Sequence, residues 1–350
     1  MTAEGLSEDE GFSIEITDSK TGRGSLRSFR HCVLAALALF VLLPRASAND
    51  YPSRPVTLIA PWPAGGAVDT LCRIFAAKLT DRFGKSVIVE NRPGAGSVLG
   101  VAAAARAAPD GYTMVMAGSA SLATTVTIYK KLPYDPMKEF SPLALITRIP
   151  FLLVVNPSLP VKTVPELIAL AKKEPGRLSY ASGGPGSPHH LFMELFKSMT
   201  GTQMLHVPYK GTAPAINDVI GGQVPVMFGD VVASLPLATS GKVRSLAVSS
   251  SVRLPSAPDI PTVAEAGVPG FEGVGWVMIV APAHTPRPIV DRLYTELKSI
   301  AAMPEIQKQM IALGTIPIES PAPDTQQEFI DSEIERWRKV VTLAGIAGTQ

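Results

Sequence analysis

Two glycine-rich turns carry the residues whose types and spacing could bind an anion. In the first, a buried strand at Val56–Ala60 runs into the Pro/Gly-rich turn Pro61–Gly66 and then into a helix, whose apolar face carries Leu71, Ile74, Phe75 and Leu79. In the second, strand Leu178–Ser182 passes through Gly183–Gly186 into a helix with Ser187 at its N-cap and a proline at its first position. The start of a helix leaves backbone N–H groups without partners and carries partial positive charge. We therefore expect both turns to bind anions.

The second turn also contains the side chains of a conceivable hydrolase. A nucleophile, a base and an orienting acid could be assembled from Ser187, His189, His190 and Asp230. The G-x-S-x-G elbow of such enzymes is absent, however, because a proline and a histidine follow Ser187. Capping of the helix and packing of its first turn explain these residues without catalysis. The sequence therefore favours a binding protein and predicts no enzyme activity.

The histidines do not have the spacing of a metal site. His189, His190, Glu194 and His206 form no HExxH or comparable pattern. Two adjacent histidines on a helix point about 100° apart, so they cannot easily share one ion. We expect no metal ion.

A third glycine-rich segment, Asn91–Gly100, is close to a dinucleotide-binding fingerprint. A cofactor site would have its glycines directly after a strand and an acidic residue on the next strand. Here an Asn-Arg-Pro segment intervenes, and the next predicted strand, Thr113–Ala117, carries no acid. We expect no cofactor.

Asp69, Asp230 and Trp62 each leave two interpretations open. Each aspartate follows a strand end near a helix start, where it could stabilise the first helical turn or receive a cationic or hydroxyl group of a ligand. Trp62 could pack at a domain edge or contact the carbon skeleton of a ligand.

Alternating strand and helix patterns must position these turns. Gly118–Ser121 follows another strand end, where ligands collect in open α/β sheets. Two β-rich stretches, Leu143–Ile149 and Phe151–Val155, lead into Asn156–Pro160, which we interpret as a crossing between domains; the chain crosses back near Gly273–Val280. This alternation on both sides of a double crossing predicts an α/β protein with two doubly wound, Rossmann-like domains and a ligand cleft between them. The predicted first domain comprises residues 49–154 and 275–350, and the second comprises residues 155–274.

The N-terminal residues 1–48 have the pattern of an export signal with a long leader. An apolar run, Cys32–Leu43, follows a polar segment with three arginines, and Ala46–Ala48 supplies the small residues of a cleavage site. The apolar run is too short to span a bilayer comfortably. We expect cleavage near Ala48 and a periplasmic protein.

The charge and the cysteine content of the chain argue against nucleic acid as a partner and against a disulfide. Removal of residues 1–48 takes five of the 32 Lys and Arg and six of the 30 Asp and Glu, which leaves a formal net charge of +3. Such a chain has no electrostatic footprint for nucleic acid. Only Cys72 remains after cleavage, so no intramolecular disulfide is expected.

Several motifs in order resemble one known family. They are YPSRPVTLIAPWPAGGAVD, VENRPGAGSVLG, PDGYTM, LSYASGGPGSPHHL and HVPYKGTAPAINDVIGGQVPVMFGD. Together they resemble the Bug/TctC family of periplasmic solute receptors for tripartite tricarboxylate transporters, over nearly the whole chain from Tyr51 to Ala344. The resemblance implies a type II periplasmic-binding-protein architecture that closes on a small ligand, usually a carboxylate.

The resemblance also implies a set of ligand-binding residues. The loop after the first strand would hold the carboxylate through backbone N–H groups and ordered water, and the opposing strand ends would complete the site. The implied residues are Trp62, Pro63, Ala64, Gly65, Gly66, Asp69, Ser119, Ser121, Ser182, Gly186, Ser187, His189 and Asp230. Trp62 and Ala64 depart from the usual family pattern, which puts the size and chemistry of the ligand in question.

We therefore expect a monomeric receptor for a small organic acid that delivers its ligand to membrane transporter subunits. A receptor that reports its ligand to a membrane sensor protein is the first alternative, because both roles would use the same closed surface. A serine hydrolase that uses Ser187 is the second.

Overall fold

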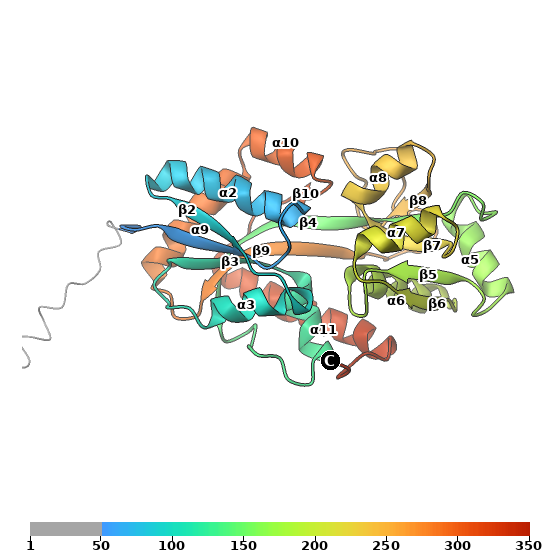
Figure 1. Cartoon of the computed structure of the whole chain (residues 1–350), viewed down its shortest axis with the longest axis horizontal. Coiled ribbons are helices and arrows are strands. Elements are labelled where there is room, and N and C mark those ends of the chain that lie inside the picture. The colour runs from blue at the N-terminus through green and yellow to red at the C-terminus, as the bar shows by residue number, and fades with distance from the viewer. Residues whose placement is uncertain (1–50) are drawn as a thin grey trace, which may run out of the picture. The chain divides into compact units, whose positions relative to one another are not determined.

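A ten-stranded sheet organises residues 51–350, the part of the chain that the computed structural model describes, with helices above and below it in the view of Figure 1. The strand order is β2-β1-β3-β9-β4-β7-β5-β6, with β8 and β10 paired to β4 outside this path. The predicted export signal, residues 1–48, lies outside the described residues. Within residues 51–350, no helix is both long and apolar enough to cross a membrane.

The first half of the sheet lies on the left in Figure 1. Its strands are β1 (Val56–Ala60), β2 (Val87–Asn91), β3 (Thr113–Gly118), β9 (Val274–Pro282), β10 (Ile316–Pro317) and the beginning of β4 (Phe140–Val155). Its helices are α2 (Ala67–Phe83), α3 (Val98–Ala105), α4 (Thr125–Ile128), α9 (Arg287–Ala301), α10 (Pro304–Ala312) and α11 (Pro323–Leu343), with a 3-10 turn at Ala95–Ser97 and a π-helical turn at Ala120–Thr124.

The second half continues from the end of β4. Its strands are β5 (Ser179–Ser182), β6 (Leu205–Pro208), β7 (Val226–Asp230) and β8 (Arg244–Val248). Its helices are α5 (Val164–Lys173), α6 (Pro188–Thr200), α7 (Thr212–Ile220) and α8 (Val231–Thr239).

Helix α2 shows why these segments fold as they do. Leu71, Phe75 and Leu79 recur on one helical face and are fully buried. Gly84 ends the helix in the left-handed conformation, where glycine carries no steric cost, and its N–H bonds the carbonyl of Thr80. The apolar spacing in the sequence therefore predicts both the helix and the face that it buries.

Strand β4 joins the two halves and differs from the prediction. The two predicted strands, Leu143–Ile149 and Phe151–Val155, form one strand of 16 residues. Residues up to Pro150 pair with β9, and residues from Phe151 pair with β7. The change of partners thus falls before Asn156–Pro160, where the sequence indicated a crossing. A proline inside an apolar run reads as a break in the sequence, but Pro150 lies at the changeover, where a missing N–H is tolerated.

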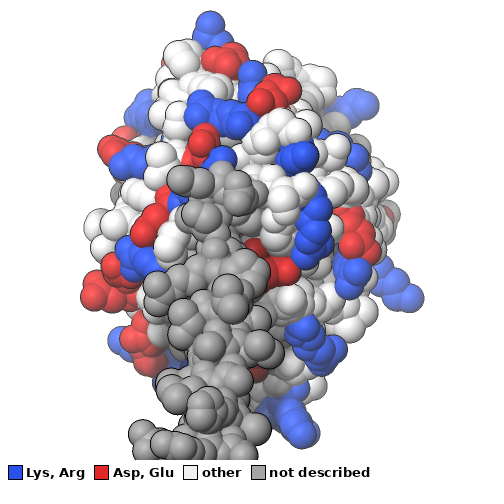
Figure 2. Space-filling view, turned by 90° about the vertical axis from the view of Figure 1, so that its left-hand side faces the viewer, with Lys and Arg blue, Asp and Glu red and all other residues white. Residues whose placement is uncertain are grey.

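One face of the protein, shown in Figure 2, has Lys and Arg side chains interspersed with Asp and Glu. A surface for nucleic acid would gather positive charge into a stripe or patch. The visible part of this face has no such arrangement, in keeping with the nearly balanced composition.

Candidate functional site

The turns that follow β1, β3, β5 and β7 lie at strand ends that point toward one another. Gly118 at the end of β3 lies opposite Val277 of β9, which lies opposite Thr147 of β4. Asp230 at the end of β7 lies opposite Phe151 of β4. Strand β3 runs in the direction of β4 and β7 runs against it, so their carboxyl ends face each other. At about 3.3 Å per residue, the interval from Thr147 to Phe151 spans roughly 13 Å of strand.

Strands β1 and β5 run parallel to β3 and β7 respectively, so their turns belong to the same place in the fold. We name Pro61–Gly66 the first turn and Gly183–Ser187 the second turn. Among the described residues, no hydrogen bond joins a predicted site residue of the first half to one of the second half.

The first turn is held by the carboxylate of Asp69. This buried group accepts hydrogen bonds from the Gly65 amide at 2.9 Å, from Asn91 Nδ2 at 2.8 Å, and from Arg73 Nε and Nη2 at 3.0 and 3.1 Å. Asn91 Nδ2 also donates to the carbonyl of Trp62 at 3.1 Å. Asp69 therefore fixes the turn at both ends, and its oxygens are occupied by protein donors.

The electrostatics of Asp69 follow from these bonds. Burial alone would raise the pKa of Asp69. The hydrogen bonds from Arg73, Gly65 and Asn91 outweigh burial, so the pKa of Asp69 lies below its ordinary value. The group stays ionised at neutral pH and keeps the first turn closed around it.

The start of α2 is open. Gly66 occupies the N-cap position without a side-chain cap, and no described group accepts a hydrogen bond from the amides of Gly66, Ala67, Val68 or Asp69. Pro63, Ala64, Gly65 and Gly66 are exposed. Four free amides at the positive end of a long helix form an arrangement that can receive a carboxylate.

Trp62 is half-buried beside the end of β3. A Cβ at Gly118 would lie 3.3 Å from Cζ2 of Trp62 and 3.2 Å from the carbonyl oxygen of Trp276. Glycine at position 118 therefore lets the indole approach the strand end. This position is compatible with both interpretations of Trp62: the ring packs against the end of β3, and it also lies where a ligand at the strand ends could contact it.

Ser119 and Ser121 differ in how they are used. The hydroxyl of Ser121 donates to the carbonyl of Gly118 at 3.2 Å and accepts from its amide at 3.3 Å, so it closes the end of β3. The hydroxyl of Ser119 has no hydrogen-bond partner among the described residues. Of the two predicted residues, Ser119 has the group that is available to a ligand.

The second turn is held by neutral side chains. Ser182 Oγ accepts from the Gly184 amide at 3.1 Å and lies 2.6 Å from Nε2 of His206. Ser187 Oγ donates to the carbonyl of Gly184 at 2.7 Å, and the Ser187 amide donates to the same carbonyl at 3.2 Å. Ser187 occupies the N-cap position of α6, as predicted, but its side chain does not cap the helix.

His190 completes this arrangement. Its Nδ1 accepts the Gly186 amide at 3.1 Å, and its ring stacks on His206 with centroids 3.9 Å apart. Burial and repulsion from His206 lower the pKa of His190 to about 4. Burial likewise lowers the pKa of His206. Both rings are therefore neutral at pH 7, and neutral Nδ1 is the form that can accept the N–H of Gly186.

Three amides of the second turn are thus consumed within it, at Gly184, Gly186 and Ser187. The amides that lack an acceptor among the described residues are those of Gly183, at the start of the turn, and of His189 and His190, in the first turn of α6. The second turn offers a carboxylate fewer donors than the first.

Asp230 lies beside the second turn. Its Oδ2 accepts from Thr212 Oγ1 at 2.7 Å and lies 3.2 Å from Nε2 of His189. The buried His189 ring stands edge-on to Phe151, with centroids 5.1 Å apart. Asp230 occupies the N-cap position of α8 but makes no capping bond.

The geometry does not form a hydrolytic triad. Ser187 bonds Gly184, whereas the Nε2 atom of His189 meets Asp230 and Thr212. The one close serine–histidine pair of this turn is Ser182 with His206, and Ser182 is fully buried. Within residues 51–350, no group of three or more His, Cys, Asp or Glu is placed to hold a metal ion.

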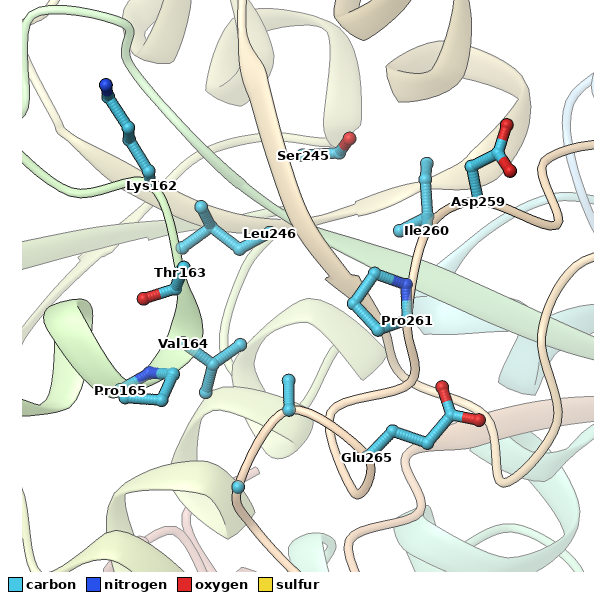
Figure 3. Close-up of a pocket in the computed structure, with 12 residues that line it drawn as sticks. Lys162, Thr163, Val164, Pro165, Ser245, Leu246, Asp259, Ile260, Pro261 and Glu265 are labelled. Carbon is cyan, nitrogen blue, oxygen red and sulfur yellow. The ribbon is translucent and has the colours of Figure 1, made fainter.

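A pocket of about 680 Å³ lies elsewhere, between the start of α5, strand β8 and the loop 259–267 (Figure 3). Ser245 of its lining lies opposite Val154, beyond Phe151 and away from the facing strand ends. Two of its polar side chains are engaged: Thr163 Oγ1 accepts the Glu166 amide at 3.3 Å, and Glu265 pairs with Arg253 at 2.8 Å. We do not assign this pocket to the predicted site.

Sequence reasoning missed four residues that shape the site. Asn91 and Arg73 hold Asp69, and His206 and Thr212 hold Ser182 and Asp230. Arg73 lies one helical turn after Asp69 on α2, a spacing typical of ion pairs, whereas Asn91, His206 and Thr212 come from other elements and carried no comparable signal in the sequence. The glycines of Asn91–Gly100 also gain a structural reason, because a Cβ at Gly100 would lie 2.6 Å from the Cβ of Pro61, so Gly100 lets α3 approach the first turn.

Comparison with protein families gives one consistent match. The model of the tripartite tricarboxylate transporter family receptor, TctC, matches residues 71–346. Among curated relatives, the protein BugT of Bordetella pertussis is 36% identical over 318 residues, which cover 89% of this chain and 97% of BugT. A protein from the tcbD–tcbE intergenic region of Pseudomonas sp. is 37% identical over 316 residues, which cover 89% of this chain and 94% of that protein.

Solved structures agree with the family match. A protein of R. palustris solved with adipate is 38% identical, with a TM-score of 0.77 over 85% of this chain and 99% of its own. The periplasmic binding protein BugD is 35% identical, with a TM-score of 0.73 over 85% and 99%. MatC from Rhodopseudomonas palustris with bound malate is 33% identical, with a TM-score of 0.72 over 83% and 100%. The fold is therefore the α/β, type II architecture of periplasmic binding proteins, as predicted.

Proposed function

Because the chain belongs to the tripartite tricarboxylate transporter receptor family, we propose that it is a periplasmic receptor that binds a small organic acid between the two halves of its sheet and delivers it to a membrane transporter. The family consists of substrate-binding receptors rather than enzymes. Relatives with bound adipate and malate support a carboxylate as the ligand. We further propose that residues 1–48 direct export and that the two predicted domains, 49–154 with 275–350 and 155–274, close on the ligand as a monomer.

The observation that supports this proposal best is the open start of α2. Four amides without described acceptors stand behind a turn that Asp69 holds, and the ends of β5 and β7 face that turn. A carboxylate bound there would accept charge-assisted hydrogen bonds of about 1.5 to 3 kcal/mol each. A few such bonds support micromolar affinity after the cost of ordering the ligand.

We assign the roles of the predicted residues accordingly. In the first turn, the half-buried Trp62 and the exposed residues Pro63 to Gly66 contact the carboxylate and the first carbons of the ligand. Ser119 and Asp230 complete the site from the other strand ends. Asp69, Ser121, Ser182, Gly186 and Ser187 hold these groups in place through their hydrogen bonds to the protein, and His189 does so through its Nε2 atom.

The proposal is tested by ligand-induced stabilisation. The protein, expressed from its full coding sequence and purified from the periplasmic fraction, is screened by thermal shift against mono-, di- and tricarboxylates, amino acids and their amides. A ligand that binds only the folded state raises the melting temperature in a saturable way. Stabilisation by no member, together with no small acid released on denaturation and detected by mass spectrometry, would contradict the proposal.

A matched pair of glycines tests the site itself. Gly65 and Gly84 flank α2; both have positive φ, and a Cβ added at either would have no atom within 4 Å. Gly65→Leu should weaken binding about ten-fold or more by obstructing the first turn, whereas Gly84→Leu should carry only the shared backbone cost. Equal affinities in the two variants would remove the first turn from the site.

The enzyme alternative is tested separately. A serine-directed phosphonate should leave Ser187 unlabelled, because its hydroxyl is bonded to the Gly184 carbonyl rather than to a histidine. Stoichiometric labelling of Ser187 would favour a hydrolase. Delivery to a transporter rather than a sensor is tested by ligand-dependent uptake in vesicles that contain the membrane subunits.

A further inference from the structure

The carboxylate of Asp230 is held by only one of its two oxygens. Both of its hydrogen-bond partners, Thr212 Oγ1 and His189 Nε2, meet Oδ2. No described residue donates to Oδ1, and the side chain is 34% exposed. A carboxylate oxygen without a partner among the described residues therefore remains at the end of β7.

The surrounding residues fix the direction of this carboxylate. The ring of His189 is buried against Phe151, which lies directly opposite Asp230 on β4. Thr212, at the start of α7, holds the same oxygen from the other side. Helix capping, the usual structural role of an aspartate at this position, is not realised, because the side chain bonds these two residues instead of α8.

Asp230 also keeps its negative charge. Burial would raise its pKa, but the bonds from His189 and Thr212 outweigh burial and set the pKa below its ordinary value. One opposing charge is near in the chain: Lys210 is exposed two residues before Thr212 and forms no ion pair with a described residue. The test below includes Lys210 for this reason.

We propose that Asp230 makes the protein select acids that carry a hydrogen-bond donor at the end away from the bound carboxylate: an ammonium, carboxamide or hydroxyl group. This inference rests on the proposed function, with the ligand carboxylate at the first turn and its distal end toward β7. A distal donor would bond Oδ1 of Asp230, whereas a distal carboxylate would face a fixed negative charge. The ligand class is thus amino, amido or hydroxy acids rather than simple dicarboxylates.

The test uses two ligand series of fixed length. Each series has a carboxylate at one end of a four-carbon or six-carbon chain, and the group at the other end is methyl, hydroxyl, carboxamide, ammonium or carboxylate. Affinities are measured by calorimetry at pH 7. For the wild-type protein, the ammonium member of at least one series should bind more tightly than the methyl member, and the carboxylate member should bind most weakly.

The isosteric variant Asp230→Asn removes the charge and keeps an acceptor for Thr212. It should weaken the ammonium member about ten-fold or more, strengthen the carboxylate member, and leave the methyl member unchanged. Asp259→Asn is the matched control, because this exposed aspartate lies in the second half of the protein on the separate pocket of Figure 3. Its ligand preferences should equal those of the wild type.

Three outcomes would overturn the inference. The first is tightest binding of a distal carboxylate that Lys210→Gln abolishes. The second is an equal loss of affinity for all members in Asp230→Asn. If this variant also melts at a lower temperature without ligand, Thr212→Val serves instead: it keeps the charge of Asp230 and must retain the preference for the ammonium member. The third is binding of no member in either series; together with no stabilisation by any acid of the thermal-shift panel and no acid released on denaturation, it would contradict the proposed function as well.

Discussion

The first and second turns share one sequence pattern and are held by opposite chemistry. In the first turn, an ionised and buried carboxylate, Asp69, accepts the Gly65 amide together with Asn91 and Arg73. In the second turn, a neutral imidazole, His190, accepts the Gly186 amide. In the first turn, the donors thus bond to the Asp69 side chain, and the first amides of α2 have no acceptor among the described residues.

A strand, glycines and a helix therefore do not by themselves make equal anion sites. In the second turn, the amides of Gly184, Gly186 and Ser187 already donate to protein acceptors on Ser182, His190 and Gly184 respectively. We expect the affinity for a carboxylate to follow the number of helix-start amides that remain free: α2 leaves those of Ala67, Val68 and Asp69 open, whereas α6 begins with Pro188, which has no N–H.

Acidification should give the largest difference between the two turns. The pKa of His190 lies at about 4 in the folded protein, below its ordinary value of 6.5. The unfolded chain therefore binds more protons in this range, so stability is complete above pH 6.5 and is lost as the pH falls toward 4. The loss assigned to this group is roughly 3 kcal/mol, from 1.36 kcal/mol per pKa unit. The charged and titratable groups that face it are His206, Tyr180, Glu194 and Lys197.

A matched variant isolates this contribution. His190→Asn keeps an acceptor near the position of Nδ1 but does not titrate between pH 4 and 6.5. Denaturant unfolding of both proteins across this range should show a smaller fall for the variant. The Asp69 carboxylate, whose pKa is lowered, loses its contribution only as the pH falls below about 3.8. Parallel curves for the two proteins from pH 6.5 to 4 would exclude His190 as the acid-sensitive group.

Removal of the first-turn carboxylate should have the next largest effect. Asp69→Ala leaves the Gly65 amide and Asn91 without their acceptor, while the exposed Arg73 can regain water. We expect a loss of about 2 kcal/mol of stability and at least about ten-fold weaker ligand binding. Urea unfolding and calorimetry measure the two effects. Asp81→Ala, at an exposed position of the same helix, should change stability by less than about 0.5 kcal/mol. Unaltered affinity in Asp69→Ala would show that the turn does not need this group.

A contact between the two halves at Gly186 should give the smallest effect. A Cβ there would lie 2.7 Å from Cδ1 of Ile128 in α4, and φ at Gly186 is 73°. Gly186→Ala should cost about 1–2 kcal/mol. Gly201→Ala, at the other end of α6, has a similar φ of 63° and no atom within 4 Å, so it carries the backbone cost alone. Shortening Ile128 to valine should relieve the excess in Gly186→Ala, and absence of that rescue would mean that the contact does not matter.

The sequence was sufficient for the elements that position the site. Apolar runs and helical spacing predicted the strand before the first turn and the buried face of α2, because burial of Leu71, Phe75 and Leu79 depends on local order alone. Glycines marked both turns, and Gly65 and Gly186 do adopt positive φ. The facing of the strand ends followed from the alternation of strands and helices.

The partners that close the turns could not be predicted, because they meet through strand register. Strand β6 pairs with β5 in a register that sets His206 opposite Tyr180, and His206 thereby comes within hydrogen-bond distance of Ser182. Asn91 reaches Asp69 from the end of the adjacent parallel strand. Local composition does not determine either register. The sequence therefore places Asp69 and Ser187 alike, near the start of a helix, and does not show which groups they bond.

Backbone amide resonances of the first turn would show where the ligand carboxylate binds. With the best ligand of the screen at saturation, the amides of Gly66, Ala67 and Val68 should shift in two-dimensional NMR more than those of any residue in the pocket of Figure 3, because they become donors to the carboxylate. Unshifted resonances at these three residues, with large shifts at Ser245 and Leu246 instead, would refute binding at the start of α2 and place the ligand in the other pocket.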